Sequence, residues 1–206
     1  MGSRVQEPIS DHHVGQRHLD RMVMLSDGVF AIAITLSALE IRPPETTGTA
    51  SLWEAWSAPL LVYFLSFLLI GIIWLHHRRV VAHLRDIDGI GTGINLALLS
   101  VVALMPMVTR YVIEVTHGKG IVVYLAAVLV TFGCMAALWA YLALVARLAP
   151  DVPRARAVRW LLEIAFPALG ALTVVLYDAH PWAALCSVVV ILAALAWAAR
   201  LERRAS

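Results

Sequence analysis

The segment "RMVMLSDGVFAIAITLSALEI" (Arg21–Ile41) decides the fold, because it has the length and the apolar character of a membrane-crossing helix. A helix needs about 20 predominantly apolar residues to cross a hydrocarbon core of about 30 Å. Asp27, next to Ser26, is the one charged residue between Met22 and Leu39. An ionised side chain at the bilayer centre costs about 2.5–3.5 kcal/mol, and less near the interface. We therefore expect the Ser26–Asp27 pair to face other helices rather than lipid.

The composition of the whole chain is typical of an integral membrane protein. Of its 206 residues, 61% are hydrophobic and 15% are charged, and the mean hydropathy is +0.80. Soluble domains average roughly 45–50% apolar residues, so a soluble fold of this length could not bury so much apolar surface. The net charge of +2 gives no sign of nucleic-acid binding. Cys134 and Cys186 both fall in apolar runs, which argues against a disulfide.

Hydropathy windows of about 19 residues predict an all-α membrane protein with six transmembrane helices. We expect these helices at about residues 22–41, 58–77, 92–113, 121–146, 160–178 and 181–200. Pro43 and Pro44 end the first helix and Pro59 precedes the second, because proline disrupts a helix interior. Pro106 and Pro167 lie inside predicted helices and predict kinks. The predicted organisation is a polar tail at 1–20, one membrane domain at 21–201 and a tail at 202–206.

The basic residues predict the orientation of these helices. If both termini lie in the cytoplasm, the inner side holds 13 of the 16 Lys and Arg residues and the outer side holds three. The inner residues are Arg4, Arg17, Arg21, Arg78, Arg79, Arg85, Arg147, Arg154, Arg156, Arg159, Arg200, Arg203 and Arg204; the outer ones are Arg42, Arg110 and Lys119. Cytoplasmic loops of membrane proteins carry the excess of basic residues. The sequence thus predicts a multi-pass protein with both termini cytoplasmic.

One face of the first predicted helix collects a continuous stripe at 100° per residue. The stripe consists of Arg21, Leu25, Gly28, Ile32, Thr35, Leu36 and Leu39. Asp27 falls on a different seam with Ala31 and Ala38, whose small side chains allow another helix to approach closely. From the residues alone, the stripe is also explained by contact with lipid or a protein core, and Asp27 by a structural pair with a basic group.

Residues Arg21–Leu36 resemble the signature helix of the transmembrane protein 175 family, the endolysosomal potassium channels and their prokaryotic relatives. The family signature is Arg, three residues, then Phe-Ser-Asp, and Leu25 stands here in place of the phenylalanine. "IGIIWLHHRR" (Ile70–Arg79) resembles the end of the family's second helix, and "INLALLSVVALMPMVTRYV" (Ile94–Val112) resembles its third. The remaining three helices agree with the family mainly in hydropathy.

The resemblance implies a potassium channel of moderate selectivity in a bacterial cell membrane, with four identical subunits that place their first helices around a central pore. The narrowest ring of the family lies five residues after the motif aspartate, which is Ile32 here; a hydroxyl ring follows at Thr35, and further apolar rings correspond to Leu36 and Leu39. The resemblance also implies an inter-helix polar network of Arg21, Ser26, Asp27, Trp74, His77 and Asn95. It implies no cofactor besides the permeant potassium ion.

Such a pore has to select without backbone carbonyls, since the sequence contains no Thr-Val-Gly-Tyr-Gly loop. A hydrophobic constriction gates by dewetting and obliges ions to shed water, and potassium holds its water less tightly than sodium. The Thr35 hydroxyl either replaces part of the lost hydration shell or bonds back to its own helix. The glycine-rich segment Asp88–Gly93 is expected to be a turn and a helix start rather than a filter.

Other functions stay open from the sequence: an ion-coupled secondary transporter, a proton-permeable leak channel, a membrane enzyme and a structural subunit. Transporters use intramembrane charges near the midplane, whereas Asp27 lies close to one end of its helix. We expect no enzyme and no metal site, because no Cys or acidic pattern accompanies the histidines. These histidines are His12, His13, His18, His76, His77 and His83. His77 is the one expected to respond to pH within the polar network.

Overall fold

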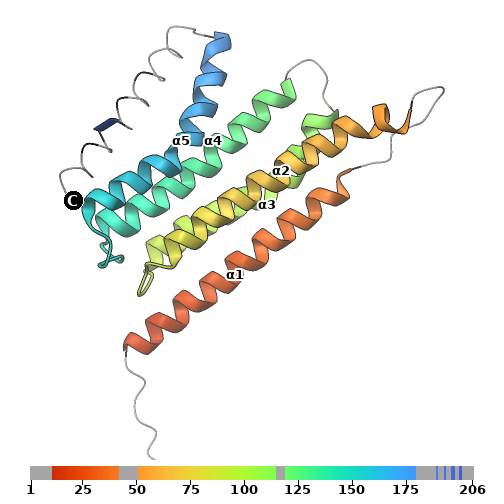
Figure 1. The fold of residues 1–206 in the computed structure, drawn as a ribbon. Coiled ribbons are helices and arrows are strands. Elements are labelled where there is room, and N and C mark those ends of the chain that lie inside the picture. Colours follow the sequence, from red (N-terminus) through yellow and green to blue (C-terminus); the bar gives the residue numbers. More distant parts are fainter. Residues whose placement is uncertain are drawn as a thin grey trace, which may run out of the picture.

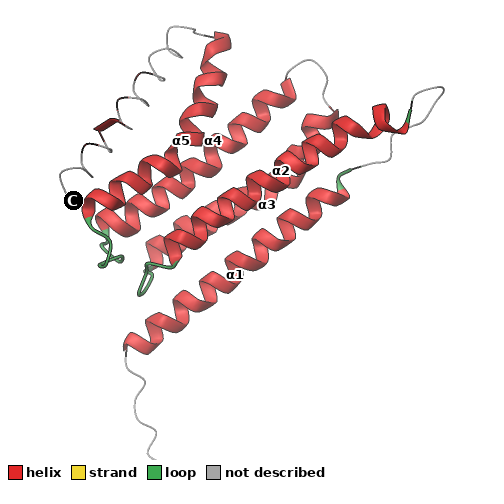
Figure 2. Cartoon of the chain, in the orientation of Figure 1, coloured by secondary structure: helices red, strands yellow, loops and turns green. Residues whose placement is uncertain are grey.

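The computed structural model describes residues 11–41, 51–114 and 119–179, together with isolated residues beyond 188. Over these residues the chain is helical, with no strand (Figure 1; Figure 2). The elements are α1 (Asp11–Leu39), α2 (Leu52–Val81), α3 (Gly89–Glu114), α4 (Lys119–Ala140), the π-helical turn η1 (Tyr141–Val145) and α5 (Arg154–Ala179). Five of the described helices are long and apolar enough to cross a membrane, with η1 continuing α4. The all-α prediction is confirmed.

The first two helices begin earlier than predicted. α1 begins at Asp11 rather than at residue 22, so residues 11–20 are helical and not part of a tail. α2 begins at Leu52 rather than at residue 58, and Pro59 lies inside it. Hydropathy detects only the part of a helix that matches the hydrocarbon core, whereas the backbone hydrogen bonds continue beyond that part. A proline within a membrane helix is tolerated where neighbouring groups satisfy the freed backbone carbonyl.

The other described helices follow the predicted spans. α3 and α5 start a few residues before the predicted 92 and 160, and α4 with η1 covers nearly all of 121–146. α5 contains Pro167 and bends along its length in Figure 1, as predicted for a proline inside a helix. The predicted sixth helix, 181–200, lies almost entirely outside the described residues.

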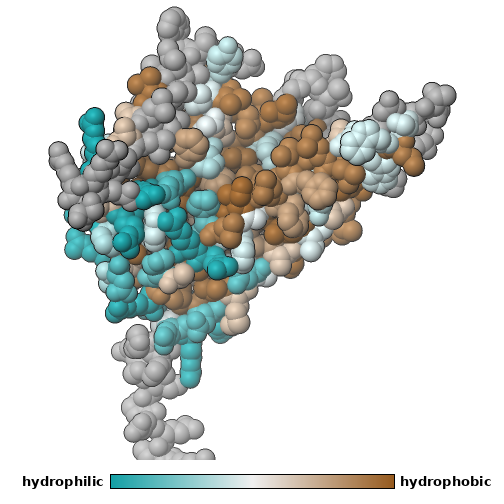
Figure 3. All heavy atoms as spheres, viewed as in Figure 1, coloured by the Kyte–Doolittle hydropathy of each residue, from teal (hydrophilic) through white to brown (hydrophobic). Residues whose placement is uncertain are grey.

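The polar surface gathers at the end of the bundle that holds the α2–α3 and η1–α5 connections (Figure 3). Asp88 begins α3 there, and its carboxylate accepts the Gly91 N–H at 2.8 Å, which is the usual role of an N-cap residue. This confirms the predicted helix start. The Tyr141 hydroxyl also donates to the Asp88 carboxylate and thereby lowers the pKa of Asp88 from its ordinary value. The α3 start is therefore tied to η1.

The core lies between α3 and its neighbours and leaves one side of α1 uncovered. α1 packs against α2 and α3, while α4 packs against α3 and α5. Phe30 of α1, Leu98 of α3 and Met135 of α4 are each at most 1% exposed. In contrast, Ala31 and Ala38 of α1 are exposed, so this small-residue seam is available to a further helix.

Candidate functional site

The buried side of α1 carries a chain of hydrogen bonds that ends on α2. Asn95 of α3 donates from Nδ2 to Ser26 Oγ at 3.1 Å, and its Oδ1 lies 2.8 Å from His77 Nε2. Because an amide oxygen can only accept, His77 is the donor in this pair. Ser26 donates its own hydroxyl proton to the Met22 carbonyl at 2.8 Å. The exposed fractions of Ser26, Asn95 and His77 are 0%, 0% and 1%, so the chain of bonds is closed to solvent.

Asp27 is held by a separate contact with α2. Trp74 Nε1 donates to Asp27 Oδ1 at 2.8 Å, and the Arg78 guanidinium carbon lies 5.6 Å from the centroid of the Trp74 ring. Adjacent helix residues point about 100° apart, which is why Ser26 meets α3 while Asp27 meets α2. Two contacts at this angle fix the rotation of α1 about its own axis.

The structure therefore brings five of the predicted network residues into two branches. One branch is Ser26–Asn95–His77, and the other is Asp27–Trp74. Arg21 is not joined to either branch: it makes no hydrogen bond or ion pair with any residue that the structure describes. The Phe30 ring packs on the His77 ring with centroids 5.4 Å apart. Sequence analysis misses this contact, although Phe30 lies one helical turn after Ser26.

The stripe predicted on α1 lies on its uncovered side. Ile32, Leu36 and Leu39 are 58%, 42% and 77% exposed, whereas Phe30 on the other side is 1% exposed. A Cβ placed on Gly28 would meet nothing within 4 Å. The stripe therefore leaves a continuous apolar surface that lipid or another protein surface has to cover.

Thr35 lies in the middle of this stripe, and its hydroxyl bonds back to its own helix. Its Oγ1 donates toward the carbonyls of Ala31 and Ile32, both at 3.0 Å. Of the two arrangements open from the sequence, the structure thus has the back-bond. A hydroxyl oxygen keeps two lone pairs when it donates its proton, so Thr35 retains the capacity to accept or to bind a cation.

Two further interhelical contacts are missed by sequence analysis. Thr109 Oγ1 donates to Ser66 Oγ at 2.9 Å, which joins α3 to α2 within the bundle. Arg79 of α2 joins α5, since its Nη1 lies 2.9 Å from Glu163 Oε2 and its guanidinium carbon lies 3.9 Å from the Trp160 ring centroid. No local pattern marks these pairs, because their members are far apart in the sequence.

The histidines bond individually rather than as a cluster. His76 and His83 place Nδ1 at 2.8 and 2.9 Å from carbonyl oxygens of their own helix. His18 Nε2 lies 3.1 Å from Thr92 Oγ1, which ties the start of α1 to the start of α3. Among the described residues, no three His, Cys, Asp or Glu side chains are grouped to hold a metal ion. The side chains of His12 and His13 lie outside the described part of the chain.

Comparison with known proteins identifies one family. The profile of the Endosomal/lysosomal potassium channel TMEM175 family matches residues 21–106. A potassium channel of Streptomyces collinus is 37% identical over 162 residues, which are 73% of this chain and 77% of that protein. A potassium channel of Chryseobacterium sp. is 36% identical over 92 residues, 45% of this chain and 47% of that protein. The crystal structure of a lysosomal potassium-selective channel TMEM175 homolog from Chamaesiphon minutus matches with a TM-score of 0.66 at 25% identity, over 92% of this chain and 98% of the other.

Proposed function

Because the chain belongs to the endosomal/lysosomal potassium channel TMEM175 family, we propose that it is a potassium channel whose pore is lined by α1. Four copies place the uncovered stripe of α1 around a common axis. The relatives are named potassium channels, and the matched crystal structure is that of a potassium-selective channel. One observation carries the choice of α1: the same helix has a hydrogen-bonded, buried side and an apolar, uncovered side.

The hydrogen bonds of α1 support this placement because they set which residues point away from the bundle. At 100° per residue, Thr35 lies about 180° from Ser26 around the helix. Ser26 is buried against α3, so Thr35 and its neighbours on the stripe face outward. A helix whose apolar side only met lipid would need no such control of its rotation.

The constriction in this proposal is a ring of four Ile32 side chains. An apolar ring of this kind excludes water unless it widens, and it obliges a passing cation to lose part of its hydration shell. Thr35 lies one turn further along α1, and its oxygen is able to replace part of that shell because its proton is already donated to the backbone. Leu36 and Leu39 extend the apolar lining. Selectivity is moderate, since one hydroxyl per subunit offers fewer ligands than a ring of carbonyls.

Assembly completes the polar network in this proposal. Arg21 finds no partner within the described part of its own chain, and we place it at the contact between subunits of the homotetramer. The polar end seen in Figure 3 faces the cytoplasm, together with both termini, in a bacterial cell membrane. This orientation agrees with the distribution of basic residues.

The helices favour a channel over an ion-coupled secondary transporter. Transporter sites commonly form where membrane helices unwind near the midplane. Within the described residues, α2, α3 and α5 continue through Pro59, Pro106 and Pro167 without such a break. A proton-permeable leak differs from a potassium channel only in the ion that passes, so the reversal potential in a proton gradient separates these two functions.

Recording of purified protein in a planar bilayer tests the function and the constriction separately. Ile32→Asn is expected to raise the single-channel conductance and to lower the K⁺/Na⁺ permeability ratio, because a polar ring stays wet. Val174→Asn is the matched control, since Val174 is 55% exposed on α5 and is expected to change neither quantity. Wild-type protein without a potassium current contradicts the channel function; an unchanged Ile32→Asn channel contradicts only the place of the constriction.

The role of Thr35 has its own variant. Thr35→Val keeps the shape of the side chain and removes the oxygen, so we expect current to persist with a lower K⁺/Na⁺ permeability ratio. Thr173→Val on α5 is the matched control, because Thr173 also bonds back to its own helix, at 2.8 Å from the Leu169 carbonyl. Equal ratios in both variants and the wild type contradict a role for Thr35 in selection.

A further inference from the structure

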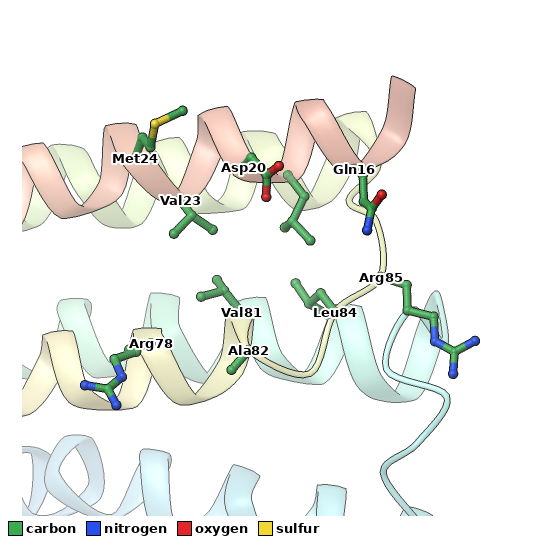
Figure 4. A pocket seen from close by; sticks show the side chains of 10 residues that line it. Gln16, Asp20, Val23, Met24, Arg78, Val81, Ala82, Leu84 and Arg85 are labelled. Atoms are coloured by element: carbon green, nitrogen blue, oxygen red, sulfur yellow. The ribbon is translucent and has the colours of Figure 1, made fainter. Parts of the chain in front are cut away.

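A groove lies between the first half of α1 and the last turns of α2. Its volume is about 990 Å³, which lies within the range of sites that hold a small molecule. In Figure 4, Val23 of α1 points toward Val81 and Leu84 of α2. Val81 and Leu84 are each 8% exposed, so the floor of the groove is apolar.

Charged side chains stand around this floor. Asp20 reaches from α1 toward α2 in Figure 4, while Arg78 and Arg85 extend from α2 at the margins. Arg85 is engaged by Asp151, with Nη2 and Oδ1 3.0 Å apart. Asp20 and Arg78 have no ion-pair partner among the residues that the structure describes. The groove therefore offers one cation and one anion that are not neutralised within the described chain.

The groove crosses the boundary between the apolar and polar parts of the protein. The part of α2 able to cross a membrane ends at Val81, while Ala82 and Arg85 follow it. Lipid head groups occupy this depth, with their acyl chains on the apolar side. Arginine presents its N–H groups in a geometry that matches phosphate oxygens, and Arg78 carries them at the margin.

We propose that this groove binds one phospholipid whose head group carries both a phosphate and a primary ammonium. Arg78 donates to the phosphate, Asp20 accepts from the ammonium, and the apolar floor contacts the glycerol and the first methylene groups. A head group with negative charge alone leaves Asp20 without a counter-charge beside the phosphate, so the groove discriminates against it.

The bound lipid lies next to the contact that orients α1. Arg78 is 5.6 Å from the Trp74 ring centroid, and Trp74 holds Asp27. Occupancy of the groove therefore steadies the α2 side of this contact. The inference concerns lipid binding and does not depend on ion conduction.

Native mass spectrometry of the intact assembly tests the proposal. Purified protein is incubated with phosphatidylethanolamine or with phosphatidylglycerol at equal concentration, and the fraction that retains lipid is measured. Wild type is expected to retain phosphatidylethanolamine in several-fold excess. Arg78→Gln is expected to lower retention of both lipids several-fold, and Asp20→Asn to abolish the preference between them. Arg156→Gln is the matched control, because Arg156 is an exposed arginine on α5 outside the groove.

Three results overturn the proposal. The first is equal retention by Arg78→Gln and Arg156→Gln, with circular dichroism showing that both variants keep their helices. The second is wild-type retention of phosphatidylglycerol that equals or exceeds that of phosphatidylethanolamine. The third is no retained phospholipid at all, in which case a second copy of the chain covers the groove.

Discussion

Replacing Asn95 with alanine removes the side chain that links α1, α2 and α3, and we expect it to weaken the folded bundle measurably. Asn95 makes one hydrogen bond of 3.1 Å to Ser26 and one of 2.8 Å to His77. Interhelical hydrogen bonds in membranes contribute about 0.6 kcal/mol on average and up to about 1.7 kcal/mol. Loss of two such bonds lowers the free energy of unfolding by about 1–3 kcal/mol. The upper part of this range applies because His77 stays buried without its acceptor.

The measurement is unfolding of the purified protein in mixed micelles, in which dodecyl maltoside is titrated with sodium dodecyl sulfate and helix content is followed by circular dichroism. Ser100→Ala is the matched control, since Ser100 is an exposed residue of α3 that bonds only to its own helix, at 2.7 Å from the Ala97 carbonyl. It is expected to change the free energy by less than about 0.5 kcal/mol. Combining Asn95→Ala with Ser26→Ala isolates the coupling between the two residues. If Asn95→Ala unfolds like Ser100→Ala and the coupling is zero, these hydrogen bonds do not hold α1.

Three further changes test other contacts. Trp74→Phe keeps an aromatic ring but removes the donor to Asp27, and we expect a loss of about 1.5–3 kcal/mol in the same unfolding assay; a loss equal to that of the exposed control contradicts this. Tyr141→Phe removes the hydroxyl that lowers the pKa of Asp88. A lowered carboxyl pKa stabilises the fold above the ordinary value of 3.8, and this contribution is lost as the pH falls through the lowered pKa. The variant is therefore expected to be less stable than wild type near neutral pH, with a difference that shrinks in acid; a difference independent of pH refutes the assignment. Arg79→Ala removes a stacked and paired guanidinium, and a loss of about 1 kcal/mol that decreases with added salt is expected; a loss that salt leaves unchanged assigns the effect to packing alone.

Much of the candidate site is readable from local sequence patterns. The apolar length of each segment predicts the described helices, and the 100° spacing identifies the stripe that contains Ile32 and Thr35. The resemblance of the first three helices to one family is confirmed by the match over residues 21–106 and by the relatives. Helix starts are less accessible, as Asp11 and Leu52 show, because polar residues outside the hydrocarbon core carry no hydropathy signal.

Partners of individual side chains are not readable in this way. The acid and hydroxyl at Ser26–Asp27 indicate that some polar partner exists, since lipid cannot satisfy them. Which partner each of them finds depends on how three helices approach one another. Arg79 illustrates the limit, because its contact with Glu163 joins residues 84 positions apart.

The sequence alone determined that this chain forms membrane helices, that one face of the first helix is a continuous apolar stripe, and that polar groups interrupt it near one end. These properties depend on residue type and on helical period, which are local. Tertiary structure alone decided that Ser26 meets Asn95 while Asp27 meets Trp74, and hence which way the stripe faces. The physical reason is that the rotation of a helix about its axis costs nothing in its own backbone and is settled only by contacts with its neighbours.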